Sequence, residues 1–173
     1  PPGPGIEQRI GEDSEVQYRG RNNMKGYYKM PDDTKETLIE GGWQRTGDLG
    51  EIDAEGFLKI TGRLKDLIVT AGGKNVAPSA IEGVIGTSKY ILQVCVIGDR
   101  RPYLTALITL DQENVKAYAA ANGIAFSSFA ELLRDPRIMA LIDVEVASFN
   151  KEFASFEQIK RVAIIDEFTI AND

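Results

Sequence analysis

Short alternating runs separated by glycine dominate the first half of the chain. Fifteen of the 17 glycines lie at or before Gly86, which is typical of short strands joined by tight turns. Val16–Arg19 alternates weakly as a strand, and residues 48–53 and 56–61 predict the two arms of a β-hairpin. A helix is expected over residues 32–40, starting at residue 32 or 33, because a proline precedes it and two glycines follow it.

Longer apolar patterns mark the second half and predict helices packed on a small sheet. Ile91–Ile97 and Tyr103–Leu110 have the β-branched and apolar content of buried strands, and Arg161–Ile165 is expected to be the last strand. Leu67–Thr70 predicts a short strand before a glycine turn. A helix is expected over Gln112–Asn122, since glycine follows it directly.

Two further helices are indicated by their capping residues. Ser79 and Glu82 have the spacing of a capping box, and Gly86 would end the short helix that follows. Asp135 is expected to cap a helix whose first residue is Pro136. An apolar stripe follows at near-helical spacing and predicts a helix face buried on the sheet: Ile138, Ile142, Phe149, Phe153 and Phe156.

This pattern predicts an α+β fold with a boundary near Arg63–Asp66. Before the boundary lies a β-rich segment with no evident closed core of its own. After it lies an α+β unit of about a hundred residues, with a central sheet flanked by helices, which is long enough to form an independent domain.

Composition removes several classes of function. The formal net charge is −6, so the chain has no cationic surplus for binding nucleic acid. No apolar run approaches the roughly 20 residues of a membrane span. Histidine is absent and Cys95 is the only cysteine, which excludes His-dependent catalysis, His-ligated metals and an internal disulfide within this chain. Cys95 is expected to be a strand residue, and a reducing, cytoplasmic setting is compatible with it.

Thr46-Gly47-Asp48 is the first candidate for chemistry. It offers a hydroxyl, a permissive backbone and a carboxylate at the entrance of a strand. A carboxylate there can accept hydrogen bonds from a vicinal diol, as acidic residues do with ribose in dinucleotide folds. From these three residues alone, a turn-capping role for Asp48 is the simpler interpretation.

A second candidate segment runs from Arg63 to the glycines at 72 and 73. Arg63 carries a planar, permanently charged donor group suited to ribose or phosphate oxygens. Gly72-Gly73-Lys74 lacks the glycine spacing and the Ser/Thr of a Walker-type phosphate loop. A tight turn that allows close approach of a narrow ligand, or a plain hairpin turn, accounts equally well for Gly72 and Gly73.

In this order, the motifs resemble the adenylate-forming superfamily of acyl-CoA synthetases, luciferases and peptide-synthetase adenylation domains. VQYRGRNNMKGYYKMPDDTKE is similar to the family segment G-x-x-x-M-x-G-Y-x-x-x-P, GWQRTGDLG to its TGD motif, and GRLKDLIVTAGGKNVAPSAIE to its hinge and glycine-turn loop. IVTAGGKNVAP and YLTALITLDQENV most resemble bacterial long-chain fatty acid–CoA ligases.

The resemblance implies a role for each matching residue. Asp48 would hold the ribose hydroxyls of ATP or of the acyl-adenylate, and Arg63 would contact the same nucleotide from the far side of the junction. Lys65 would be the hinge residue about which the small domain rotates. Gly72 and Gly73 would line the passage for the pantetheine arm of CoA.

The resemblance also implies three segments: 1–62 as the end of the large adenylating domain, 63–66 as the hinge, and 67–173 as the small mobile domain. The PPGPG opening is typical of the interior of a longer protein, and the family's phosphate-binding loop would lie upstream. The family's C-terminal catalytic lysine would follow EFTIAND, whereas the last lysine here is Lys160. We therefore assign no catalytic residue and expect the isolated fragment to be inactive.

The implied activity of the intact protein is that of an AMP-forming long-chain fatty acid–CoA ligase. It would use ATP, Mg²⁺ and CoA with a fatty acid, act together with the missing large domain, and reside in the cytoplasm. No protein-held metal and no nucleic-acid partner are expected, and peripheral membrane association stays open. Two alternatives also stay open: a fatty acyl-AMP ligase that loads a carrier protein, and a non-catalytic module that has kept the fold.

Overall fold

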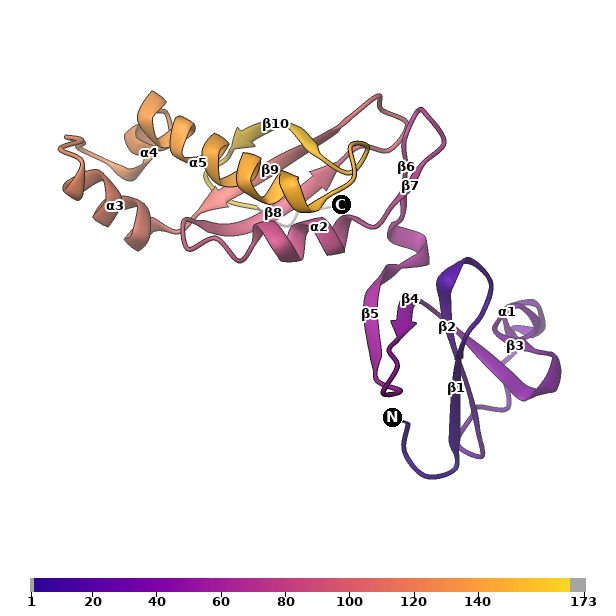
Figure 1. Cartoon of the computed structure of the whole chain (residues 1–173). Helices are drawn as coiled ribbons and strands as arrows, with labels where there is room; N and C mark the ends of the chain where they lie inside the picture. The colour runs from indigo at the N-terminus through magenta and orange to yellow at the C-terminus, as the bar shows by residue number, and fades with distance from the viewer. Residues whose placement is uncertain (1, 169–173) are drawn as a thin grey trace. The chain divides into compact units, whose positions relative to one another are not determined.

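The computed structural model describes residues 2–168 of the chain, which divides into two compact units (Figure 1). Unit 1 is Pro1–Leu67 and unit 2 is Ile68–Asp173. Both contain a β-sheet and helices, so the expected α+β class is confirmed.

Unit 1 is built on an antiparallel sheet in the order β1-β2-β4-β3, with β5 paired to β4. The hairpin predicted from the sequence is β4–β5, and its turn is closed by the Asp53 carboxylate, which accepts from the N–H groups of Glu55 and Phe57. The strands of unit 1 are β1 (Ile6–Ile10), β2 (Glu15–Gly20), β3 (Leu38–Ile39), β4 (Trp43–Ile52) and β5 (Leu58–Arg63).

The helix predicted over residues 32–40 is shorter than expected. Helix α1 (Pro31–Thr37) begins at the proline and ends before Leu38. Gly41 and Gly42 have φ of 78° and 76°, a conformation that glycine adopts without steric cost. They turn the chain so that β3 pairs back on the start of β4. Strand pairing therefore replaces the last helical turn.

Unit 1 buries little apolar surface. Among its described residues, Val16 and Leu49 are the buried hydrophobic side chains, in keeping with the expectation that this segment has no closed core of its own. Glu15 and Gln17 are buried beside them. The interior of this unit is therefore formed by polar side chains as well as by hydrophobic ones.

Unit 2 has a three-stranded sheet in the order β10-β9-β8. Strand β8 (Ile91–Ile97) is antiparallel to β9 (Leu104–Leu110), and β10 (Ile159–Ile164) is parallel to β9. These strands confirm the three predicted from the apolar pattern to within two residues at each end. A small hairpin, β6 (Ile68–Val69) with β7 (Asn75–Val76), precedes them.

Helices cover this sheet and close a continuous apolar core (Figure 1). Helix α2 contacts both β8 and α5, and α5 also contacts β10. The core side chains that are almost completely buried include Ile81, Ile85, Leu104, Ile108 and Ile142. The helices of unit 2 are α2 (Pro78–Ile85), α3 (Gln112–Ala121), α4 (Phe129–Leu132) and α5 (Pro136–Phe149).

The capping box predicted at Ser79 and Glu82 is wrong. Helix α2 begins at Pro78 with Ala77 as its N-cap, so Ser79 is already inside the first turn. The Glu82 carboxylate instead accepts from the Val96 N–H at 2.8 Å. Since β8 is an edge strand, this bond supplies a partner for a backbone donor at the sheet edge. The predicted end of the helix at Gly86 is confirmed.

Helix α5 begins as predicted, with Asp135 as N-cap and Pro136 as first residue. Its buried stripe consists of Ile138, Ile142 and Val146. Phe149, the last residue of α5, and Phe153 pack against the same core and are partly buried. Phe153 and Phe156 lie beyond the end of the helix, and Phe156 is 40% exposed, so the predicted stripe is not helical to its end.

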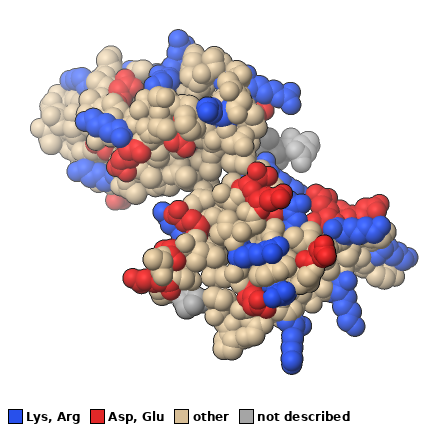
Figure 2. All heavy atoms as spheres, turned by 45° about the vertical axis from the view of Figure 1, so that its right-hand side comes forward, with Lys and Arg blue, Asp and Glu red and all other residues tan. Residues whose placement is uncertain are grey.

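Both units display basic and acidic side chains on the face drawn in Figure 2. Within the described part of the chain, no helix is long and apolar enough to cross a membrane.

Truncating the buried face of α5 should destabilise unit 2. Ile142→Ala removes a side chain that is 1% exposed and should lower the free energy of unfolding by about 2–5 kcal/mol. Val144 lies on the same helix but is 67% exposed, so Val144→Ala should change it by no more than about 0.5 kcal/mol. Urea unfolding followed by circular dichroism measures both, and equal losses would contradict the burial of this face.

The cap of α5 should make stability depend on pH in the acid range. Hydrogen bonds from the Arg137 guanidinium and then from its backbone N–H lower the pKa of Asp135 to about 2 from 3.8. A carboxyl whose pKa is lower in the folded state stabilises the fold above its unfolded pKa and loses that contribution as the pH falls through its folded pKa. The stabilisation should therefore be complete above about pH 4 and disappear by about pH 2.

Asp135→Asn keeps a capping oxygen but does not titrate, so it is the matched control. The melting temperatures of the two proteins should converge as the pH falls from about 4 to about 2. A constant difference across this range would show that the Asp135 charge does not contribute.

Candidate functional site: a bulge on β4 and its partners

The Thr46-Gly47-Asp48 motif forms a bulge in strand β4, which we call the TGD bulge. Gln17 of β2 pairs with Arg45 of β4, and Glu15 pairs with Leu49. One residue of β2 therefore lies opposite the three residues of the motif, and β4 carries two extra residues at this point. Bulges of this kind re-aim side chains and are frequent beside functional sites.

Three hydrogen bonds hold the TGD bulge in place. The Thr46 hydroxyl donates to the Val16 carbonyl at 2.8 Å and accepts from the Asp48 N–H at 3.0 Å. The Gly47 N–H donates to Oε1 of Glu15 at 3.0 Å. Gly47 has φ of 75°, a left-handed conformation that explains why glycine occupies the middle of the motif.

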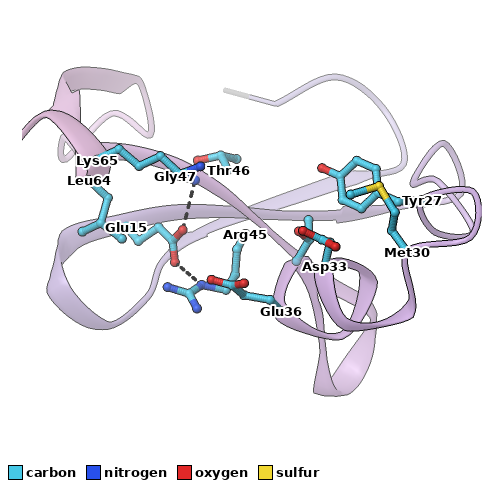
Figure 3. A pocket seen from close by; sticks show the side chains of 11 residues that line it. Glu15, Tyr27, Met30, Asp33, Glu36, Arg45, Thr46, Gly47, Leu64 and Lys65 are labelled. Atoms are coloured by element: carbon cyan, nitrogen blue, oxygen red, sulfur yellow. Dashed lines mark hydrogen bonds and ion pairs between the residues drawn. The ribbon is translucent and has the colours of Figure 1, made fainter.

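The second oxygen of Glu15 is bound by Arg45. Arg45 Nε donates to Oε2 of Glu15 at 2.7 Å, and the two side chains are 38% and 3% exposed respectively. The hydrogen bond and the charge of Glu15 raise the pKa of Arg45 above its ordinary value. Figure 3 shows the Glu15 carboxylate between Gly47 and Arg45, with a dashed line to each.

Asp48 and Arg63, the two predicted nucleotide-binding residues, are direct neighbours. They are opposite one another in the β4–β5 register, and Arg63 Nε donates to Oδ1 of Asp48 at 2.9 Å. This bond and the charge of Asp48 raise the pKa of Arg63. Both side chains reach solvent, Asp48 being 33% and Arg63 67% exposed. Arg63 is thus in unit 1 with Asp48 and not on the far side of the junction, which corrects that expectation.

A cavity of about 420 Å³ lies beside the TGD bulge. Lys65, the predicted hinge residue, lines it from the short 3₁₀ helix Leu64–Asp66. The other lining residues shown in Figure 3 are of mixed charge and polarity: Glu15, Tyr27, Met30, Asp33, Glu36, Thr37, Arg45, Thr46, Gly47 and Leu64. Asp48 and Arg63 are not among them.

Gly72 and Gly73 lie in unit 2, in the turn between β6 and β7. Gly73 has φ of 72° and its N–H donates to the Thr70 carbonyl at 2.8 Å. Thr70 also accepts from the Lys74 N–H through its hydroxyl. The segment is thus a tight hairpin turn between β6 and β7, a geometry compatible with both roles that the sequence left open.

Glu15 is the site residue that sequence reasoning missed. Weak alternation over residues 16–19 predicts one apolar and one polar face, which would leave Glu15 and Gln17 in solvent. Both are buried, as is Val16 between them. A glutamate that occurs once in a short strand gives no sequence signal for a buried partner thirty residues away.

Among the described residues, no group of three or more Asp, Glu, Cys or His side chains is placed to hold a metal ion. A bound cation therefore has no evident protein cage in this part of the chain.

The α+β unit that follows the TGD bulge and the 3₁₀ helix Leu64–Asp66 identifies the class of protein. The family model of the AMP-binding enzyme C-terminal domain matches residues 65–169, and the chain belongs to this family of adenylate-forming enzymes. The resemblance drawn from the sequence motifs is therefore confirmed.

Two relatives of the chain are named as long-chain-fatty-acid–CoA ligases. The chain is 41% identical over 165 residues to the long-chain-fatty-acid–CoA ligase FadD15 of Mycobacterium tuberculosis, covering 95% of this chain and 27% of that protein. It is 35% identical over 167 residues to long-chain-fatty-acid–CoA ligase 5 of Mus musculus, covering 94% and 24%. The chain thus spans about a quarter of the length of these relatives.

Solved structures show the same fold. The crystal structure of ATP-bound MatB from Rhodopseudomonas palustris superposes with a TM-score of 0.67 and 28% identity, covering 96% of this chain and 31% of MatB. An ATP-bound MatB chimera gives a TM-score of 0.70 at 29% identity, with the same coverage.

Proposed function

We propose that the chain is part of an AMP-forming long-chain fatty acid–CoA ligase. The observation that carries this proposal is the 41% identity over 95% of the chain to a protein named as such a ligase. In the first half-reaction, the fatty acid carboxylate attacks the α-phosphorus of ATP, giving acyl-AMP and pyrophosphate. In the second, the CoA thiolate attacks the acyl carbon and AMP leaves.

Asp48 and Arg63 are the proposed nucleotide contacts. A carboxylate can accept from both hydroxyls of a ribose, and a guanidinium can donate to hydroxyl or phosphate oxygens. One Asp48 oxygen accepts from Arg63 Nε at 2.9 Å. Because Arg63 is 67% exposed, its side chain can rotate toward the nucleotide at little cost, which would free that oxygen for the ribose diol. The proposed Mg²⁺ would arrive with the phosphates of ATP, since its ligands there are phosphate oxygens and water.

Lys65 is the proposed hinge and the turn at Gly72 and Gly73 the proposed pantetheine contact. The two half-reactions need different protein groups, since the first takes place at the α-phosphorus of ATP and the second at the acyl carbon, and a hinge between two compact units can exchange these groups. Support for this position comes from the division of the chain between Leu67 and Ile68, directly after the 3₁₀ helix that holds Lys65. A glycine turn allows the close backbone approach that a narrow pantetheine arm requires.

The proposed location is the cytoplasm, where a free thiol such as Cys95 stays reduced. The protein would act together with a large domain outside this chain, and the isolated chain is expected to form neither acyl-AMP nor acyl-CoA. A carrier-protein acceptor is the alternative within the same chemistry. The test measures AMP release by the full-length protein. Release that requires free CoA indicates the proposed ligase, whereas release that requires an acyl carrier protein indicates the alternative.

In the full-length enzyme, Asp48→Ala should weaken ATP binding by about tenfold or more. The variant removes the proposed acceptors of the ribose hydroxyls, and one hydrogen bond to a charged group is worth about 1.5–3 kcal/mol. Fluorescence or calorimetric titration with ATP measures the loss. Glu51→Ala is the matched control, because Glu51 also lies on β4 and pairs across the hairpin with a cation of β5, Lys59.

Glu51→Ala should leave ATP affinity unchanged. If Asp48→Ala likewise preserves ATP affinity and only lowers the melting temperature, Asp48 is a structural turn residue and not a nucleotide ligand.

Lys65→Pro should separate the two half-reactions. Proline fixes φ near −65° and restricts the residue before it, so the backbone at Leu64 and Lys65 cannot switch between two conformations. We expect pyrophosphate release from fatty acid and ATP to change by only a few-fold. CoA-dependent thioester formation should fall by at least about tenfold more, because it requires the rotated state.

The side-chain control is Lys65→Ala, which leaves the backbone free and should affect both half-reactions mildly. Equal losses in both half-reactions for Lys65→Pro, or no loss in either, would place the hinge elsewhere.

A further inference from the structure

Glu15 is a buried carboxylate that the proposed chemistry does not use directly. Among the described residues it is the only charged side chain that is buried, with 3% exposure. Burial of a carboxylate is unfavourable unless donors compensate for the lost water. Its two oxygens have such donors, the Gly47 N–H for Oε1 and Arg45 Nε for Oε2.

The two donors bracket the start of the TGD bulge. Arg45 is the residue before Thr46, and Gly47 is the residue after it. Because Glu15 is bonded to both, it holds the chain on either side of Thr46. The next residue, Asp48, is tied back to Thr46 through its own N–H. Because the extra residues of a bulge fall outside regular pairing with the neighbouring strand β2, side-chain contacts such as these act together with the pairing of Asp48 to Arg63 in β5 to set the position of Asp48.

We infer that Glu15 and Arg45 are positioning residues for nucleotide binding, acting through the TGD bulge on the carboxylate of Asp48. This inference rests on the proposed function, in which Asp48 holds the ribose. The pair does not contact the nucleotide itself in this scheme. Instead it sets where the Asp48 oxygens lie before ATP arrives, so that no binding energy is used to arrange them.

A second ion pair in the same sheet shows what a purely structural pair looks like. Glu7 of β1 and Arg19 of β2 are also joined across neighbouring strands, by the Arg19 Nε bond of 3.0 Å. Their side chains are 60% and 40% exposed, and β1 and β2 pair without a register shift. The Glu7–Arg19 pair does not bind a strand bulge, and neither residue is next to a proposed nucleotide contact. Glu7 is therefore the matched control for Glu15.

The test uses the full-length enzyme and the kinetics of acyl-CoA formation. Glu15→Gln keeps an oxygen that can accept from the Gly47 N–H but presents an amide donor to Arg45, so the paired geometry is lost. We expect the KM for ATP to rise about tenfold, while the KM values for fatty acid and CoA and the kcat change by less than about threefold. Glu7→Gln should leave all four parameters unchanged.

Arg45→Lys provides an independent variant if Glu15→Gln does not fold. It keeps a positive charge beside the buried carboxylate but loses the planar Nε donor. Since Arg45 is 38% exposed, the fold should tolerate it. A smaller rise in the KM for ATP, about threefold, is expected, again without a matching loss of kcat.

A double-mutant cycle with Asp48 separates positioning from stability. If Glu15 acts through Asp48, Glu15→Gln should raise the KM for ATP by less than about twofold in an Asp48→Ala background. The same tenfold rise in both backgrounds would overturn the inference. So would a fall in kcat that follows the melting temperature while the KM for ATP stays constant.

The cycle also distinguishes failure of the inference from failure of the proposed function. If Asp48→Ala alone does not change the KM for ATP, the proposed ribose contact is wrong and Glu15 has no ligand to position. If Asp48→Ala raises the KM but neither Glu15→Gln nor Arg45→Lys does, the proposed function stands and the positioning role alone is rejected.

Discussion

A carboxylate shielded from water is stable only where donors reach both of its oxygens, and in unit 1 this requirement decides the path of the chain. Glu15 meets it with one side-chain donor and one backbone donor, which come from the two ends of a three-residue stretch of β4. The stretch opens the bulge, and both donors reach one carboxylate there. Asp48, the last residue of the bulge, lies opposite Arg63 in the next strand. The candidate site is thus built directly beside a buried charge whose donors come from the bulge and the residue before it.

The two units are stabilised in different ways. Unit 2 has a continuous apolar core around β9, whose residues Leu104 and Ile108 are completely buried. Unit 1 buries two hydrophobic side chains among its described residues and depends more on ion pairs and strand pairing. A polar interior of this kind is sensitive to single substitutions, because removal of one partner leaves the other unsatisfied. It also places the candidate nucleotide residues in the less robust of the two units.

How far the sequence predicts this structure depends on whether the contacts are local. The strand at 91–97 and the start of α5 at Pro136 were predictable, since apolar runs and an Asp-Pro cap are local signals. The role of Glu82 was not, because its partner is the Val96 N–H, 14 residues further along the chain on β8. The end of α1 was missed for a different reason: the two glycines that suggested a helix end instead turn the chain so that β3 pairs with β4. Motif spacing identified Asp48 and Arg63 as candidates and left out Glu15, whose contacts with the TGD bulge depend on a register shift that the sequence does not encode locally.

The segment between the units has a property that a hinge requires. The 3₁₀ helix Leu64–Asp66 contains no buried residue, and it lies between Gly62 and Ile68, both of which are buried in their own units. Rotation about a buried segment would expose apolar surface at about 25 cal/mol per Å², whereas rotation about an exposed one leaves both interiors intact. The chemistry proposed for this family needs two arrangements of similar free energy, since a large difference would trap the enzyme in one half-reaction. In the proposed mechanism, an exposed connection would therefore allow the exchange of catalytic groups at low cost. The polar contacts around Asp48 would keep the proposed nucleotide contacts, Asp48 and Arg63, together within unit 1.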